Sequence, residues 1–177
     1  MEVSTVKKII NKLKKYFIMS IFVFNRDKAN ELFIKYLKNI SINIVGRPTF
    51  ISMDVYLDGT DYSLITIGDK SVISREVTIL THDFAITRAK LAIEKKIDNE
   101  IKIVKAVKIG NNSFVGAKSI LLPGADIGNN TIIGAGSIVL GRIPDNVVAA
   151  GNPCKVICGI EEYYERQIKY NGKFIIE

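Results

Sequence analysis

Aliphatic residues return at every sixth position through the second half of the chain. They are Ile109, Val115, Leu121, Ile127, Ile133 and Val139. A small residue follows four places after the first five of them, at Ser113, Ser119, Ala125, Thr131 and Ser137. A longer repeat contains this one, because residues 109–120 (IGNNSFVGAKSI) and 127–138 (IGNNTIIGAGSI) are identical at eight of twelve positions. The repeated unit is therefore six residues long within a period of eighteen.

A period of six matches neither a helix, whose apolar residues lie three and four apart, nor a strand that alternates at every second residue. Each unit has room for one short strand and one tight turn, and three units bring the chain back to the same side. The pattern predicts a triangular coil, a parallel β-helix, whose inward aliphatic residues stack at the ~4.8 Å spacing of neighbouring strands. The GNN triplets at 110–112 and 128–130 suit its corners, because Gly and Asn tolerate left-handed backbone conformations.

The first forty residues have a different pattern. Residues 3–24 place apolar side chains at helical spacing among five lysines, and residues 26–39 predict a second helix with Asn25 or Asp27 as its cap. The predicted organisation is a helical segment at 1–40, a β-helix domain at 41–158 and a helical tail at 159–177. The fold class is thus mainly β, a single parallel β-helix with helices at both ends.

The hexads are less regular at both ends of the coil. We expect the coil to begin near Ile44, with Val45, Ile51 and Leu57 pointing inward. Ten residues separate Leu57 from the next hexad aliphatic, so residues 58–64 form a small excursion at one corner. The ladder is expected to loosen after Val139, in the segment GRIPDN, whose proline lacks the amide donor of a central strand.

A longer interruption follows Leu80. The segment is highly charged for more than twenty residues and lacks the small hexad residues, so we expect a projecting loop at about 81–106. Long loops in compact domains tend to be functional. His82, the chain's only histidine, lies where the coil gives way to this loop.

The hexads, the string ILTHDF at 79–84 and the string IPDNVVAAGNPCKVI at 143–157 together resemble the hexapeptide-repeat acyltransferases. The resemblance covers about residues 44–157 and is closest to the maltose, galactoside and polysaccharide O-acetyltransferase branch. It implies a left-handed coil, a homotrimer, and acetyl-CoA as the acyl donor. The left hand comes from the resemblance alone, because parallel crossovers are in general right-handed.

Composition narrows the alternatives. A length of 177 residues with 47% hydrophobic content suits one domain with its own core. The net charge of +7 is compatible with the phosphates of coenzyme A, and the chain lacks the dense basic and aromatic runs typical of nucleic-acid binding. One histidine excludes the three-histidine zinc site of carbonic anhydrases, and no metal is expected. Cys154 and Cys158 alone make a disulfide framework improbable.

The basic N-terminal helix permits two interpretations. The apolar run at 16–24 is too short to span a bilayer, which needs ~20 apolar residues. The helix can lie on an anionic membrane through its lysines, or it can pack against the end of the coil or a neighbouring subunit. Packing is the favoured alternative. No cleavable signal pattern is present, so the expected location is the cytoplasm, with peripheral contact at the inner face of the membrane as the finer hypothesis.

His82 is the candidate catalytic residue. Acetyl transfer from a thioester to a hydroxyl needs a base, and imidazole is the side chain whose ordinary pKa lies near neutrality. The resemblance places the family's catalytic histidine here. Asp58, Asp54 and Asp83 are the candidates for orienting this base or binding acceptor hydroxyls. No Ser or Cys stands in a nucleophile-elbow pattern, which favours direct attack over a covalent acyl-enzyme.

The narrow, amide-rich arm of coenzyme A needs small side chains beside exposed backbone groups, and its phosphates need cations. The candidate coenzyme-binding residues are Phe114, Gly116, Ala117, Ala135, Gly136, Arg142, Asn152, Pro153 and Lys155. The resemblance implies that Phe114 stands where relatives commonly have Trp, and that Lys155 stands near the adenosine end. Arg142 follows the position at which relatives have Lys. The alternative for the glycines and alanines is that the repeat itself requires them.

These observations predict a homotrimeric O-acetyltransferase that moves an acetyl group from acetyl-CoA to a sugar hydroxyl, in surface-polysaccharide or oligosaccharide modification. One alternative is N-acetylation of an amino-sugar nucleotide or a xenobiotic. Another is a β-helix scaffold that has lost catalysis.

Overall fold

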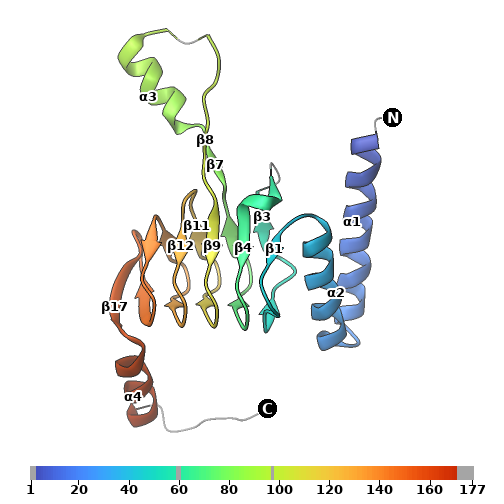
Figure 1. Cartoon of the computed structure of the whole chain (residues 1–177), viewed down its shortest axis with the longest axis vertical. Helices are drawn as coiled ribbons and strands as arrows, with labels where there is room; N and C mark the ends of the chain where they lie inside the picture. The colour runs from blue at the N-terminus through green and yellow to red at the C-terminus, as the bar shows by residue number, and fades with distance from the viewer. Residues whose placement is uncertain (1–2, 59–60, 97, 171–177) are drawn as a thin grey trace.

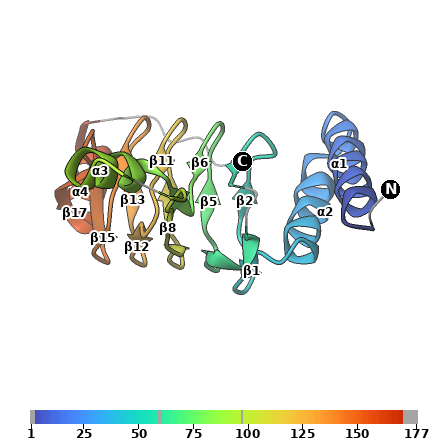
Figure 2. The same cartoon turned by 90° about the horizontal axis from the view of Figure 1, so that it is seen from above.

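The computed structural model describes residues 3–58, 61–96 and 98–170. Its centre is a three-sided coil of short strands, with two helices at the N-terminal end and an arm that stands out from one corner (Figures 1 and 2). The helices are α1 (Val3–Phe22), α2 (Arg26–Asn39), α3 (Ala85–Glu94) and α4 (Ile160–Tyr170), with one 3-10 turn, η1 (Tyr62–Leu64). Parts of the predicted N-terminal helix (1–2), excursion (59–60), loop (97) and tail (171–177) lie outside the described residues.

Each side of the coil is one sheet. The first sheet contains β1 (Asn43–Ile44), β4 (Ile65–Ile67), β9 (Val107–Ile109), β12 (Asp126–Ile127) and β15 (Arg142–Ile143). The second contains β2 (Phe50–Ile51), β5 (Val72–Ile73), β10 (Phe114–Val115), β13 (Ile132–Ile133), β16 (Val147–Ala150) and β17 (Lys155–Gly159). The third contains β3 (Tyr56–Leu57), β6 (Thr78–Ile79), β11 (Ile120–Leu121) and β14 (Ile138–Val139).

The three corners have different compositions. The asparagine corner, from the first sheet to the second, contains residues 110–112, 128–130 and 144–146. The glycine corner, from the second sheet to the third, contains residues 52–55, 74–77, 116–119 and 134–137. Residues 151–154, which join β16 to β17 within the second sheet, lie against the last turn of this corner. The arm corner, from the third sheet to the first, contains the described residues 58, 61–64, 80–96, 98–106, 122–125 and 140–141. Asn112 and Asn130 adopt left-handed conformations (φ 51° and 52°), as predicted for the GNN triplets.

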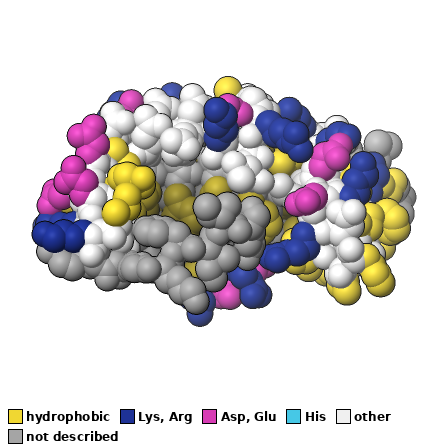
Figure 3. All heavy atoms as spheres, turned by 90° about the horizontal axis from the view of Figure 1, so that it is seen from below, with side chains coloured by type: hydrophobic (Ala, Val, Ile, Leu, Met, Phe, Trp, Pro, Cys, Tyr) yellow, Lys and Arg dark blue, Asp and Glu magenta, His cyan; other side chains and the backbone are white. Residues whose placement is uncertain are grey.

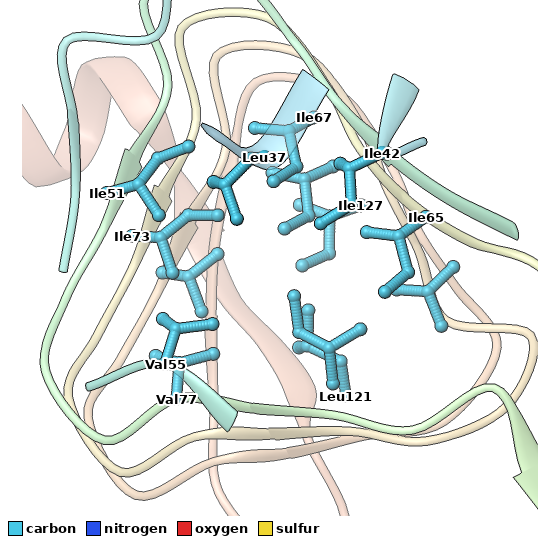
Figure 4. Close-up of a cluster of buried hydrophobic side chains, with 14 of the residues drawn as sticks. Leu37, Ile42, Ile51, Val55, Ile65, Ile67, Ile73, Val77, Leu121 and Ile127 are labelled. Atoms are coloured by element: carbon cyan, nitrogen blue, oxygen red, sulfur yellow. The ribbon is translucent and has the colours of Figure 1, made fainter. Parts of the chain in front are cut away.

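The eighteen-residue period is confirmed as the register between successive turns of the coil. Ile109 pairs with Ile127, Val115 with Ile133 and Leu121 with Val139, all in parallel. The inward aliphatic side chains of the regular turns are almost completely buried and point into the middle of the triangle (Figure 4). Burial of such stacked aliphatic side chains, at roughly 1.5–3 kcal/mol each, is the main favourable contribution to folding.

The small hexad residues are buried, and three of them, Ser113, Ser119 and Thr131, donate their hydroxyls to carbonyls of the neighbouring turn. Ser113 Oγ donates to the Gly128 carbonyl at 2.7 Å, and Thr131 Oγ1 donates to the Pro144 carbonyl at 2.8 Å. A larger side chain would displace the corner backbone, and an alanine would leave the backbone acceptor with one partner fewer. The recurrence of Ser and Thr therefore follows from the tightness of the corner.

One inward residue was predicted wrongly. Val45 is 45% exposed, and Ile44 instead pairs with Ile67 in the first sheet. The reason is the first connection between the first and second sheets, residues 45–49, where Ile44 and Ile51 are seven positions apart in place of six. The period of the ladder also changes after Val139, because Ile127 pairs with Ile143, sixteen residues later instead of eighteen.

Helix α2 covers the N-terminal end of the coil. Ala29, Phe33 and Leu37 are at most 1% exposed, and Leu37 points into the end of the triangle beside Ile51 and Ile67 (Figure 4). Its start is capped by Asn25, whose side chain accepts a hydrogen bond from the Lys28 amide at 2.8 Å. The first helix, α1, packs on α2 and joins the core through Ile18.

The opposite end of the coil closes differently. Strand β17 runs antiparallel to β16, in contrast to the parallel pairing elsewhere in this sheet. The chain then continues into α4, which begins beyond Gly159 as predicted. The ladder thus ends with a reversal of direction.

The outer face of α1 is apolar. Leu13, Phe17 and, after the helix, Val23 and Phe24 are all more than 60% exposed. Hydrophobic and basic side chains gather at the end that carries α1 and α2 (right of Figure 3). Within the described residues, no helix has the length and apolar character needed to cross a membrane.

Successive corners approach so closely that certain glycines have no room for a side chain. A Cβ on Gly116 would lie 2.4 Å from the Ala135 amide nitrogen of the next turn. We therefore predict that Gly116→Ala lowers the free energy of unfolding by ~1–3 kcal/mol, the usual cost of overpacking. Gly159→Ala, whose Cβ would meet nothing within 4 Å, is the matched control and should stay within ~0.5 kcal/mol. Chemical denaturation monitored by circular dichroism measures both, and equal stability of the two variants would contradict the packing argument.

Candidate functional site

The site begins with His82, at the foot of the arm. Residues 80–81 follow β6 of the third sheet, and His82 opens β7 (His82–Asp83), which pairs antiparallel with β8 (Ile103–Val104). The Lys105 amide donates to the Thr81 carbonyl at 2.9 Å, so the two strands of the arm leave and return at the same point. Between them stands α3, where the sequence had predicted only a loop (Figure 1). The His82 side chain is 24% exposed.

Asp58 lies directly against His82. It follows β3, and β3 pairs with β6, so residues 24 positions apart in sequence become neighbours at the arm corner. Its Oδ2 accepts from the Thr81 amide at 2.9 Å, the Thr81 hydroxyl at 3.3 Å and the His82 amide at 3.2 Å. The same oxygen is in contact with His82 Nδ1, and the contact becomes an ion pair when the imidazole is protonated. Asp58 is only 4% exposed, so burial removes most of the water around its carboxylate. The hydrogen bonds from these donors compensate for that lost hydration.

This contact determines which ring nitrogen can accept a proton. An ionised carboxylate only accepts hydrogen bonds, so the proton shared with Asp58 belongs to Nδ1. The neutral imidazole then carries its lone pair on Nε2, as in a general base oriented by a carboxylate. Phe84 packs its ring edge-on to the imidazole, with centroids 5.3 Å apart and planes at 87°. The imidazole is therefore held from two sides.

The other two aspartates that the sequence suggested lie elsewhere. Asp54 is in the glycine corner, where it accepts from Ser52 Oγ at 2.6 Å, the Glu76 amide at 3.0 Å and Arg75 Nε at 3.1 Å. Burial raises the pKa of Asp54, but these hydrogen bonds and the Arg75 charge lower it by more, so its pKa lies below the usual range. Asp83 accepts from the Ala85 amide at 2.7 Å, at the start of α3. Of the three, Asp58 is the one that contacts the imidazole.

Most of the predicted coenzyme-binding residues gather at the glycine corner. They are Gly116, Ala117, Ala135, Gly136, Asn152 and Pro153. Gly116 is buried under the next turn, which favours the repeat as the reason for this glycine. Gly136 has a left-handed backbone (φ +70°) and open space around it, and Ala135 beside it is exposed. This part of the corner has room for a narrow chain.

The three remaining predicted residues are spread over two sheets. Phe114 is on β10 of the second sheet and is 41% exposed. Lys155 is exposed on β17, at the far end of the same sheet. Arg142 is on the first sheet, where its guanidinium pairs with Asp126 at 3.0 Å. Within one chain, His82 and Asp58 therefore lie at the arm corner. Most of the predicted coenzyme-binding residues lie at the glycine corner, on the opposite edge of the third sheet.

Two residues of the histidine site were not predicted. Thr81 is fully buried and holds Asp58 through both its amide and its hydroxyl, and Phe84 packs on the imidazole. Both are in the string THDF at 81–84, within two residues of the histidine. Their closeness to His82 in sequence is the feature that could have predicted them. As for metals, the described part of the chain contains no group of three or more His, Cys, Asp or Glu side chains that could hold an ion.

Comparison with known proteins gives consistent matches. A model of the bacterial transferase hexapeptide family (six repeats) matches residues 106–141. Protein CapG of Staphylococcus aureus is 39% identical over an alignment of 148 residues that covers 78% of this chain and 83% of CapG. Galactoside O-acetyltransferase of Escherichia coli (strain K12) is 35% identical over 142 residues, 78% of this chain and 64% of the relative. A galactoside acetyltransferase solved in complex with coenzyme A aligns with a TM-score of 0.56 at 28% identity, covering 95% of this chain and 88% of that one.

The contact between Asp58 and His82 can be tested directly, because the chain has a single histidine. We predict that ¹⁵N NMR of the neutral imidazole finds the proton on Nδ1. Asp58→Ala should shift that proton toward Nε2, and it should lower the free energy of unfolding by ~1–3 kcal/mol because buried donors lose their acceptor. Asp83→Ala, which removes the carboxylate bonded to the Ala85 amide, is the control and should leave the tautomer unchanged. A wild-type spectrum with the proton on Nε2 would rule out this arrangement.

Proposed function

For this chain, a member of the bacterial hexapeptide-repeat transferase family, we propose the transfer of an acetyl group from acetyl-CoA to a sugar hydroxyl. The observation that carries the proposal is the buried Asp58 carboxylate against His82 Nδ1. It is supported by similarity to a galactoside O-acetyltransferase and to an acetyltransferase solved with coenzyme A. The process we propose is the modification of a surface polysaccharide or oligosaccharide. The left hand of the coil is part of the same proposal and follows from this likeness.

The chemistry uses His82 as a general base. Its Nε2 removes the proton of the acceptor hydroxyl as that oxygen attacks the thioester carbonyl carbon, and the ring becomes imidazolium. Asp58 stabilises that positive charge and fixes the ring orientation, as a buried carboxylate does for a catalytic histidine. When the carbon–sulfur bond breaks, the imidazolium returns its proton to the departing thiolate. The imidazole is then neutral again.

We place the donor along the glycine corner. Exposed Ala135 and the open surface at Gly136 leave room for the pantetheine arm, and Asn152, Pro153 and Lys155 follow at the end of the coil. Because this corner and His82 are on opposite edges of the third sheet, one chain does not bring donor and base together. We therefore propose a homotrimer in which the glycine corner of one copy faces His82 of the next. Acetyl-CoA would lie in the groove between them.

The apolar face of α1 has a place in this assembly. Leu13, Phe17 and Phe24 are exposed in the single chain, and contact with a neighbouring copy would cover them. The alternative is that this face lies on the inner surface of a membrane, with the α1 lysines toward anionic headgroups. Sedimentation with anionic liposomes that falls as salt rises would favour the membrane.

The role of His82 can be tested by substitution. His82→Ala should lower kcat by a factor of ~10²–10⁴, the usual contribution of a positioned base, while coenzyme A binding and the melting temperature stay close to those of the wild type. Lys102→Ala, exposed on the same arm, is the control and should retain activity. Turnover is measured by release of free thiol with a saturating sugar acceptor. A His82→Ala enzyme that keeps most of the wild-type kcat would contradict the role of His82 as general base.

The shared site can be tested by mixing subunits. His82→Ala removes the base, and Ala135→Trp fills the groove at the proposed coenzyme corner, so each variant alone should be inactive. If each site combines two copies, random reassembly of the two variants should restore about a quarter of the sites. If base and corner act within one chain, the mixture should stay inactive. Light scattering on the same samples gives the mass of the assembly, and an active monomer would contradict the trimer.

A further inference from the structure

A second feature lies next to the histidine site. A cleft of about 440 Å³ opens between the N-terminal helices and the first turn of the coil. That volume is within the roughly 300–1,000 Å³ typical of small-molecule sites. The side chains used below are Lys12 and Lys15 from α1, Phe33 and Tyr36 from α2, Tyr56 from β3 and Tyr62 from η1. The helices flank the first turn of the coil at this end of the molecule (Figure 1).

The cleft is lined by two lysines, and neither is in an ion pair among the described residues. Of its described lining residues, none carries a carboxylate, and the ion pairs of the described chain include neither Lys12 nor Lys15. Lys15 is half-buried and lies 6.0 Å from the Phe33 ring centroid. Burial lowers the pKa of Lys15, and the Asp54 charge offsets only part of this effect. An anion in the cleft would therefore replace lost hydration of this ammonium group.

The tyrosines supply the remaining chemistry. Tyr56 is 61% exposed, so its ring offers an apolar surface of the kind that packs on the C–H face of a pyranose. Burial raises the pKa of Tyr36 and, together with the Asp58 and Tyr56 charges, that of Tyr62. Both hydroxyls stay protonated at neutral pH and can donate to an oxyanion. Aromatic faces and anion-binding donors thus line the same space.

The cleft is adjacent to the proposed base. Leu57 lines it, and the next residue, Asp58, holds His82. The Asp58 charge also contributes to the raised pKa of Tyr62, as expected for groups that lie close together. A sugar ring whose hydroxyl reaches His82 could therefore extend its other substituents toward Lys12 and Lys15.

We infer that this cleft binds the acceptor and selects an anionic saccharide, one whose sugar carries a carboxylate or a phosphate. The inference rests on the proposed function and adds the charge of the acceptor, a property that the hydroxyl chemistry alone leaves open. Lys12 and Lys15 act here as specificity residues, away from the reacting atoms. A neutral glycoside would leave both ammonium groups without a partner.

The test compares glucose derivatives in which one substituent is exchanged for an anionic one, C6 carboxylate in the glucuronoside and anomeric phosphate in glucose 1-phosphate. Methyl glucoside, methyl glucuronoside and glucose 1-phosphate are supplied with acetyl-CoA, and thiol release gives kcat/KM for each. The wild type should favour an anionic sugar over the neutral one by about tenfold or more, the factor that corresponds to one hydrogen bond to a charged group. The better of the two anions identifies carboxylate or phosphate as the preferred group.

Substitutions assign the preference to the cleft. The double variant Lys12→Gln/Lys15→Gln should lose the preference for the anionic sugar. Its KM for the anionic sugar should rise, and its kcat/KM for the neutral sugar should stay unchanged. Lys14→Gln is the matched control, because Lys14 is exposed on the same helix and lines a different groove. Lys15→Arg, which keeps the charge, should keep the preference. Equal kcat/KM for charged and neutral sugars, or a preference that survives the double substitution, overturns the inference.

A separate measurement distinguishes failure of the inference from failure of the proposed function. Binding of the same three sugars is followed by NMR titration without acetyl-CoA. If no thiol is released with any sugar, the proposed function fails, but tighter binding of an anionic sugar that disappears in the double variant still supports the cleft. Equal binding of all three sugars, or equal binding by wild type and double variant, contradicts it.

Discussion

The structure depends on one ladder of stacked aliphatic side chains. Each strand is only two to five residues long, too short to persist alone, so stability comes from neighbours one turn away. Ile109 above Ile127 and Val115 above Ile133 are buried only because the register repeats. A slip by one residue would turn these side chains outward. The narrow triangular core therefore tolerates little variation along the walls of the coil.

Because the walls must keep register, extra residues can leave only at corners. The arm uses this freedom: it departs after β6 and returns before β9, and the bond from the Lys105 amide to the Thr81 carbonyl closes its base. The shorter excursion that begins at Asp58 leaves from the same corner one turn earlier. Successive turns are separated by the spacing of paired strands, ~4.8 Å. The two excursions begin at this distance from each other, and the Asp58 carboxylate therefore contacts the His82 imidazole.

The sequence predicts the regular parts of this molecule well and the corners less well. Repetition gives the register of β9 to β14, because each hexad is supported by its copy eighteen residues later. Val45 was assigned wrongly because a single extra residue in the first corner leaves no periodic trace. Helix α3 was missed since its N-cap residue, Phe84, is not a capping residue type and the helix is only ten residues long. Three aspartates were candidate partners for His82, and Asp58 is the one that the pairing of β3 with β6 brings to the arm corner, which no local sequence pattern encodes.

The two ends of the coil have a consequence for the molecule as a whole. A parallel ladder exposes unpaired amides and carbonyls at its first and last turns, and a bare edge of this kind could recruit another chain and grow into a fibre. Helix α2, with Leu37 inserted into the triangle, covers one edge. Strand β17 turns back on β16 and presents the wrong direction to any incoming parallel strand. The protein thus has a finite length because its first and last elements are unlike everything between them.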